Sequence, residues 1–245
     1  MEKYRRYFER FPPCAWRGPT FVRDSLVEAD GAFCPDSLHK VYDVQVIKSD
    51  YLIRNIDQAF EVWRGQPWGR NVAFADFLEF ILPYRVGTET LADWRQEVYD
   101  RYNPMLDSIR ASADSTDVLA VAQALMDSLS VGTVYFTGLF PSGITVGSDL
   151  VVWRSGNCRE LTDLVTYVFR ALGIPGGCDK MLMRGDKNVA HYWNFVVDGE
   201  DSTYFASIGQ SSKQFAKADT YWDPKGKSLP GDVQPEPDDA RCLRA

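Results

Sequence analysis

One cysteine in the sequence, Cys158, stands where a thiol could act as a nucleophile. It precedes an apolar stripe with helical spacing that ends at Gly173, just before Ile174-Pro175. The stripe consists of Leu161, Leu164, Val165, Val168 and Leu172. We therefore predict that Cys158 lies in the first turn of a buried helix, where unpaired backbone N–H groups and the helix dipole favour a thiolate and lower the thiol pKa. The N–H of Cys158 itself could donate to an oxyanion that develops on an attacked carbonyl.

The second candidate residue is His191, one of two histidines in the chain. It lies in a strand-like run over residues 189–197, which ends at the turn dipeptide Asp198-Gly199, and residues 203–205 form the expected return strand. A helix start that presents a thiol, followed by a strand that presents an imidazole, is the order of elements in cysteine–histidine enzymes. The other histidine, His39, has no such setting, so His191 is the candidate base.

A buried structural cysteine is the alternative interpretation of Cys158, because free cysteine is among the most buried residue types. Taken alone, Cys158 fits that interpretation better. The later strand with His191 shifts the balance toward nucleophilic catalysis, in which the imidazole takes the thiol proton. Trp153 and Trp193 are candidate substrate-binding residues if their rings are exposed.

The residues around this pair resemble the transglutaminase-like superfamily. Its core combines a G-x-C helix start, a later Leu-Gly-Ile-Pro and an H-x-W strand. This chain reads G-N-C at 156–158, L-G-I-P at 172–175 and H-Y-W at 191–193, all within about forty residues. The resemblance implies a papain-like cysteine enzyme in which Cys158 attacks a peptide or protein amide, His191 acts as base, and a thioester forms. The superfamily includes crosslinking enzymes, proteases and glycan-releasing amidases, so hydrolysis, acyl transfer and glycan-linked substrates all stay open.

Upstream segments extend the resemblance to roughly residues 40–212. Residues 51–63 and 81–85 are similar to the segment that precedes this core in many Bacteroides-type proteins. Those relatives are exported, longer multidomain proteins, so the resemblance implies a periplasmic or cell-surface location. The chain as given has a charged, aromatic start without a signal peptide, and no run of eighteen apolar residues, so we expect no membrane span.

The residue that orients His191 is open. The superfamily generally uses an aspartate on the strand after the hairpin, but residues 204–209 of this chain contain none. Asp198, at the turn, is seven residues from His191, which is about 20 Å along a strand and too far to hydrogen-bond. Ser207 is the candidate for this role, and Gln210 is the alternative, because a one-residue change of register decides between them. A backbone carbonyl or a residue from elsewhere could also orient the ring.

Composition argues against several other functions. The net charge is −7, the pI is near 4.9, and the 27 lysines and arginines form no stripe, so we expect no nucleic-acid partner. Five cysteines without C-x-x-C spacing, together with two histidines, do not suggest a zinc site. No acidic loop of EF-hand type is present for calcium. We therefore expect neither a metal nor another cofactor.

Hydrophobic periodicity predicts helices within residues 52–63, 74–82, 91–102 and 118–129, and short strand-like runs at 134–136 and 150–153. We predict an α+β fold with a papain-like or transglutaminase core, in which the Cys158 helix packs on an antiparallel sheet that contains the His191 strand. The expected divisions are a mainly helical N-terminal portion at 1–115, the catalytic core at 116–212, and a tail or the start of a missing domain at 213–245.

Two other functions compete with an active enzyme. A catalytically weakened or inactive member could bind a peptide or glycan through exposed aromatic residues, and the missing aspartate favours this alternative. A purely structural role within a larger surface assembly is the third possibility. Fast and selective modification of Cys158 would favour the enzyme.

Overall fold

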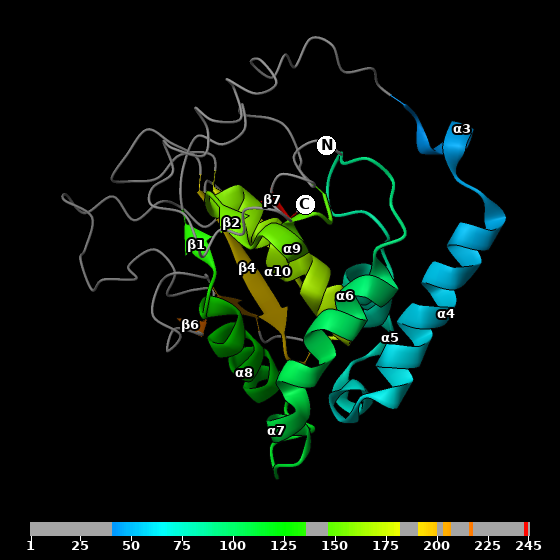
Figure 1. The fold of residues 1–245 in the computed structure, drawn as a ribbon. Helices are drawn as coiled ribbons and strands as arrows, with labels where there is room; N and C mark the ends of the chain where they lie inside the picture. The colour runs from blue at the N-terminus through cyan, green and yellow to red at the C-terminus, as the bar shows by residue number, and fades with distance from the viewer. Residues whose placement is uncertain are drawn as a thin grey trace.

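The computed structural model describes residues 41–135, 147–181, 191–199, 203–206, 216–217 and 243–244 of the 245 residues. Helices occupy most of the first part of this chain, and a small sheet follows the last helix (Figure 1). The α-helices are α3 (Asp43–Val46), α4 (Ser49–Gly65), α5 (Phe74–Asp76), α6 (Arg95–Tyr102), α7 (Asp107–Arg110), α8 (Val118–Ser130), α9 (Leu150–Trp153) and α10 (Cys158–Leu172). The other helical segments are the 3-10 helices η3 (Pro67–Asn71) and η5 (Asn103–Leu106) and the π-helix η4 (Phe77–Ile81). The strands are β1 (Val134–Tyr135), β2 (Ser155–Gly156), β3 (Gly176–Met181), β4 (His191–Val197), β5 (Thr203–Ala206), β6 (Ala216–Lys217) and β7 (Leu243–Arg244).

The long helices lie where the apolar periodicity predicts them. Helices α4 and α8 contain the predicted segments 52–63 and 118–129, while α6 begins at Arg95, four residues later than predicted. The strand-like interpretation of residues 150–153 was wrong. These residues form α9, and the N–H of Arg154 donates to the carbonyl of Leu150 over 2.8 Å, which closes a helical turn. A short apolar run does not reveal by its periodicity whether it is a strand or a helix.

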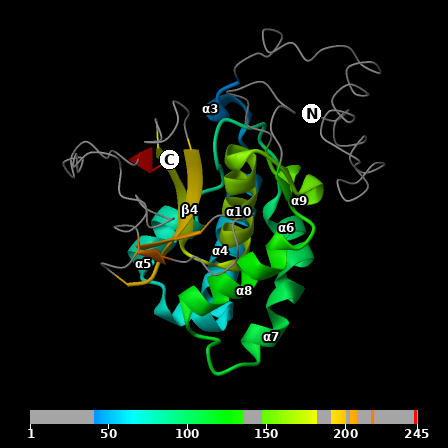
Figure 2. The ribbon, with the colours of Figure 1, turned by 90° about the vertical axis from the view of Figure 1, so that its left-hand side faces the viewer.

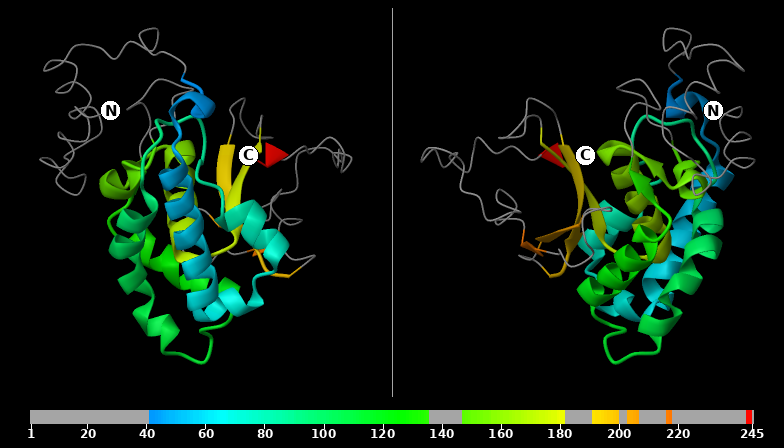
Figure 3. Two further views of the ribbon diagram at one scale, coloured as in Figure 1. Left: turned by 90° about the vertical axis from the view of Figure 1, so that its right-hand side faces the viewer. Right: turned by 60° about the vertical axis from the view of Figure 1, so that its left-hand side comes forward.

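Helix α10 lies between the sheet and the outer helices (Figure 2). It packs against α6 and α4 on one side and against β3 and β4 on the other. Every side chain from Glu160 to Leu172 is consequently buried, well beyond the apolar stripe that the sequence shows. Most of the helices gather on one side of the strands (Figure 3). The helix that bears Cys158 is thus a central packing element.

The larger sheet is antiparallel and has the strand order β6-β5-β4-β3-β7. Strand β4, which begins at His191, lies between β3 and β5. Its pairing with β3 runs from Gly176 opposite Val196 to Met181 opposite His191 without a break. A separate parallel pair joins β1 to β2, directly before α10. The structure therefore contains the predicted helix on an antiparallel sheet, together with a mainly helical part that precedes it.

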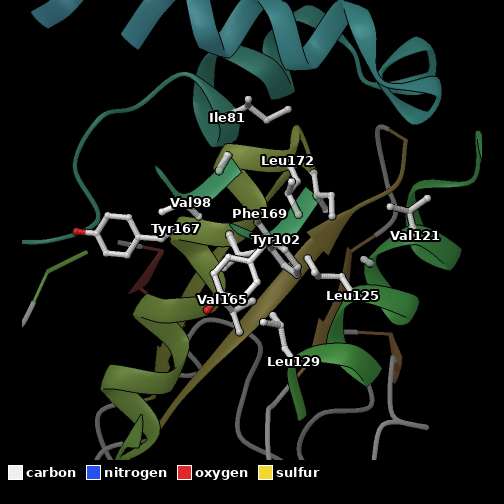
Figure 4. Packing of buried hydrophobic residues seen from close by; sticks show 14 of the residues in the cluster. Ile81, Val98, Tyr102, Val121, Leu125, Leu129, Val165, Tyr167, Phe169 and Leu172 are labelled. Carbon is white, nitrogen blue, oxygen red and sulfur yellow. The ribbon is translucent and has the colours of Figure 1, made fainter. Parts of the chain in front are cut away.

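The main hydrophobic core draws on both sides of the predicted boundary at residue 115. Tyr102 of α6, Leu125 and Leu129 of α8, and Val165 and Phe169 of α10 pack in one cluster (Figure 4). Within the described residues, the helices before the boundary and the sheet after it thus share one core. Of the predicted tail at 213–245, only β6 and β7 are described, and both are strands of the sheet. The division into three parts stays a prediction.

A buried arginine fixes the C-terminal end of α10. Arg95 is 2% exposed, and its guanidinium donates five hydrogen bonds of 2.7–3.3 Å. The acceptors are the backbone carbonyls of Arg170, Ile81, Leu82 and Pro83 and the side-chain oxygen of Asn55. Burial lowers the pKa of Arg95 to about 9, and the side chain stays protonated at neutral pH. One side chain thereby joins α4, the end of η4, α6 and α10.

Candidate active site at the start of helix α10

Local hydrogen bonds explain why the helix begins at Cys158. The side-chain oxygen of Asn157, the N-cap residue, accepts from the N–H groups of Arg159 at 2.8 Å and Glu160 at 3.4 Å. The Glu160 carboxylate in turn accepts from the N–H of Asn157 at 2.8 Å, which completes a capping box. A Cβ added at Gly156 would lie 2.4 Å from Glu160 Cβ, so only glycine fits before the cap. The predicted placement of Cys158 in the first helical turn is confirmed.

The thiol of Cys158 lies against the first peptide unit of β4. The backbone N–H of Tyr192 lies close enough to the sulfur of Cys158 to lower the pKa of the thiol. The N–H of Val197 donates to the carbonyl of Pro175 at 2.9 Å. Along an antiparallel strand, every second residue directs its backbone N–H and C=O groups to the same neighbouring strand. Val197 and every second residue before it therefore direct these groups toward β3. Tyr192 is not in that set, and its N–H points to the other side of β4. Cys158 therefore approaches β4 from the side of β5, whose pairing with β4 starts at Asn194 within the described residues.

His191 immediately precedes the amide that contacts the thiol. It is half-buried, and its ring centroid lies 6.1 Å from that of Trp193 at an interplanar angle of 34°. The N–H of Tyr192 is part of the peptide bond between His191 and Tyr192. The Cys158 sulfur, which lies near this N–H, is therefore about one peptide unit from the His191 backbone. The structure thus brings the two predicted residues to one end of β4, while a direct contact between sulfur and imidazole stays a prediction.

Electrostatics at Cys158 differ from the expectation based on the helix start alone. Burial raises the pKa of Cys158 above its ordinary value of 9.0, and the neighbouring carboxylate of Glu160 adds to this effect. The backbone hydrogen bonds from Tyr192, Arg159 and Cys158 itself lower the pKa, as predicted for a helix N-terminus, but they do not outweigh burial. The prediction of a lowered pKa was wrong in its net direction. Reaction at neutral pH consequently requires a base that takes the thiol proton.

A charged cluster holds the first turns of α10 against β4. The sequence analysis did not predict this cluster. The Arg159 Nε lies 3.0 Å from both carboxylate oxygens of Asp163, and the Arg159 guanidinium carbon lies 5.1 Å from the centre of the Tyr192 ring. Asp163 is 2% exposed, and burial raises its pKa to about 7, although Arg159 counteracts this. The four-residue spacing of Arg159 and Asp163 was the available signal for this ion pair.

A buried asparagine joins the same two elements further along. Asn194 Nδ2 donates to the carbonyl of Thr162 at 3.0 Å, to Thr166 Oγ1 at 3.1 Å and to the carbonyl of Gly177 at 3.1 Å. Its position directly after the H-x-W motif was the only hint of this role in the sequence. Asn194 thereby fixes the position of β4 along α10, and with it the place of His191 relative to Cys158.

The structure describes the side chain of only one of the remaining candidate residues. Trp193 is 3% exposed, so its ring is packed inside the protein and presents no surface to a substrate in this structure. Trp153 is the last residue of α9, but its side chain lies outside the described residues, as do Ser207 and Gln210. Over the described ranges, no group of three His, Cys, Asp or Glu side chains could hold a metal ion. Across those same ranges, no helix is long and apolar enough to cross a membrane.

Comparisons with known proteins reveal similarity to two solved structures. No protein-family model matches the chain, and no curated protein matches it. A candidate cysteine protease from Cytophaga hutchinsonii aligns with 63% of this chain and 50% of its own, at 16% identity and a TM-score of 0.40. The periplasmic domain of TgpA from Pseudomonas aeruginosa, bound to ethylmercury, aligns with 59% of this chain and 49% of its own, at 16% identity and a TM-score of 0.34. The chain thus spans about half the length of each structure.

Proposed function

We propose that the chain is a transglutaminase-like cysteine enzyme that performs hydrolysis or acyl transfer on a peptide or protein amide. The observation that carries the proposal is the contact of the Cys158 thiol, at the start of a buried helix, with the backbone of Tyr192 next to His191. In the proposed site, the nucleophile Cys158 and the base His191 meet at one end of β4. The motifs G-N-C, L-G-I-P and H-Y-W support the same class, and by that resemblance we also propose an exported location.

The proposed reaction proceeds through a thioester. His191 takes the proton of Cys158 as the sulfur attacks the carbonyl carbon, and the N–H of Cys158 donates to the resulting oxyanion. His191 then gives that proton to the leaving amine, the C–N bond breaks, and the acyl group stays on the sulfur. Water or a second amine attacks the thioester, His191 accepts the proton of the attacking group, and the thiol is regenerated when this proton returns to the sulfur.

The raised pKa of Cys158 favours one alternative function. An enzyme whose thiol is buried and whose base is poorly oriented would be weakened or inactive, and the chain would then serve as a peptide- or glycan-binding module. Burial of Trp193 removes one of the two aromatic rings on which such binding was expected to rest. We therefore place the enzyme first.

An acyl-trapping experiment tests the proposal. The protein is incubated with p-nitrophenyl acetate at pH 7.5, and acetylated cysteines are located by peptide mass spectrometry. We expect a hydroxylamine-sensitive acetyl group on Cys158, no such adduct in Cys158→Ser, and formation slowed about a hundredfold or more in His191→Gln, the usual contribution of a general base. Cys178 is the internal control, because burial raises its pKa to about 12. Equal acetylation of both cysteines, or of neither, would favour the binding module.

A further inference from the structure

His191 shares one face of the sheet with a buried carboxylate on the adjacent strand. In the pairing of β3 with β4, Asp179 lies opposite Trp193, and Met181 lies opposite His191. Directly opposed residues project to the same face, as do residues two positions apart on one strand. Asp179, Trp193 and His191 therefore project from the same face, with Asp179 as the diagonal neighbour of His191.

Contacts on the two faces confirm this assignment. Asn194, three residues after His191, projects to the opposite face, where it hydrogen-bonds to Thr162 and Thr166 of α10. Phe195, which shares the face of His191, instead packs edge-to-face on Phe80 of η4 with ring centroids 5.4 Å apart. The face that carries His191 and Asp179 is thus the one turned away from α10, so the proposed contact between His191 and Cys158 has to form around the edge of β4 that faces β5.

The two groups that could use the imidazole lie on opposite sides of β4. Cys158 approaches from the side of β5, whereas Asp179 belongs to β3 on the other side. Diagonal neighbours in an antiparallel pair have Cα atoms about 7–8 Å apart, a span that an imidazole and a carboxylate can bridge with a hydrogen bond between them. The two ring nitrogens of His191 can therefore serve one group each.

We propose that Asp179 is the positioning residue of this site, and that its carboxylate accepts a hydrogen bond from the His191 ring nitrogen that faces away from Cys158. The inference rests on the proposed pairing of Cys158 with His191. Asp179 is 5% exposed, so its charge acts through a medium of low dielectric, where a hydrogen bond to an imidazole is strong. This carboxylate fills the role for which Ser207 was the candidate, from the strand before His191 rather than the strand after it.

Histidine NMR tests the hydrogen bond directly. The chain has two histidines, so His39→Gln leaves the His191 imidazole as the only signal. In that background we expect Asp179→Asn to lower the pKa of His191 by about one unit or more, because it removes a charge that favours the imidazolium. Asp179→Glu should restore most of the shift. Asp198→Asn, which removes a carboxylate at the far end of β4, should leave the titration unchanged.

The charged neighbour of Asp179 on the other side provides a further control. Arg244 of β7 lies opposite Asp179, and Arg244→Gln should leave the pKa of His191 unchanged or raise it. An unchanged His191 titration in folded Asp179→Asn, or an equal fall in Arg244→Gln, would overturn the proposal. If Asp179→Asn does not fold, nitrogen chemical shifts of the parent protein decide. A single dominant neutral tautomer supports the proposal, and an equal mixture of tautomers contradicts it.

These outcomes separate this inference from the proposed function. Acylation of Cys158 together with a His191 titration that is independent of Asp179 would contradict only the positioning role of Asp179. A His191 titration that depends on Asp179, without any acylation of Cys158, would instead contradict the proposed enzyme activity. It would still support the hydrogen bond between Asp179 and His191.

Discussion

The two ends of helix α10 are built in contrasting ways. At the C-terminal end, Gly173 adopts a φ of 73°, the carbonyl of Leu172 accepts from Trp68 Nε1 at 3.0 Å, and Arg95 donates to the carbonyl of Arg170. The two carbonyls are buried, and they pair with side chains from distant segments. At the N-terminal end, Cys158 and Asn157 are only half-buried, and the cap is formed by residues adjacent in sequence.

This difference separates stability from chemistry on one element. The C-terminal end joins α4, η4 and α6 to α10, so changes there should affect the whole fold. The N-terminal end depends on local capping and on β4, so changes there should alter the reactivity of Cys158 at a smaller cost in stability. A thiol held on a rigid, buried helix with a partly open first turn has both a fixed position and access to a substrate.

Arg95→Met should give the largest effect on stability. It leaves the carbonyls at the end of η4 and at Arg170 buried without their donor, which should lower the free energy of unfolding by roughly 3–5 kcal/mol. Urea denaturation followed by circular dichroism measures this change. The matched control is Arg54→Met, which removes exposed ion pairs to Asp50 and Asp93 and should cost less than about 1 kcal/mol. Equal losses would show that the buried arginine has no special role.

Asp163→Asn should change how stability depends on pH. Burial raises the pKa of Asp163 to about 7 in the folded protein, so the folded state binds more protons than the unfolded state between pH 4 and pH 7. The contribution of Asp163 to stability is present at low pH and is lost as the pH rises through about 7. Relative to the parent, the variant should therefore gain on the order of 2 kcal/mol between pH 5 and pH 8. Urea midpoints at the two pH values measure this difference, and a constant difference would contradict the raised pKa.

Two N-cap variants test the difference between the ends of α10 with a smaller expected change in the free energy of unfolding. Asn157→Ala and Asp117→Ala each remove an N-cap side chain that accepts two backbone N–H bonds, from α10 and α8 respectively. Each should cost about 1 kcal/mol in thermal or urea unfolding. Only Asn157→Ala should also change the alkylation rate of Cys158, because only that cap positions the thiol. A similar change in reactivity from Asp117→Ala would mean that general destabilisation, rather than the cap, controls Cys158.

The sequence sufficed where periodicity and local motifs decide the structure. The apolar stripe and the G-N-C segment predicted helix α10 with Cys158 in its first turn, and the run before Asp198-Gly199 predicted strand β4. Helix α9 was missed, because four apolar residues carry no readable period. The apolar spacing also predicted a helix that starts at residue 91, but the first helical residue is Arg95.

Local sequence patterns could not predict which side chains near the site are buried. The sequence suggested that a helix start lowers the pKa of Cys158, but burial of the thiol reverses the net effect. Trp193 was a candidate for substrate binding if its ring were exposed, but the ring is buried in the structure. Asp179 drew no notice, because its relation to His191 depends on the register between β3 and β4, which pairs residues ten or more apart.

The pH dependence of Cys158 alkylation tests the central claim most directly. Iodoacetamide is reacted with the parent protein and with His191→Gln from pH 5 to pH 10, and modification of Cys158 and Cys178 is quantified by peptide mass spectrometry. We predict rapid modification of Cys158 near pH 7 in the parent and little modification of Cys178. In His191→Gln, the Cys158 rate at pH 7 should fall at least about tenfold, because the base that takes the thiol proton is lost. Superimposable Cys158 profiles in the two proteins would contradict the pairing of Cys158 with His191.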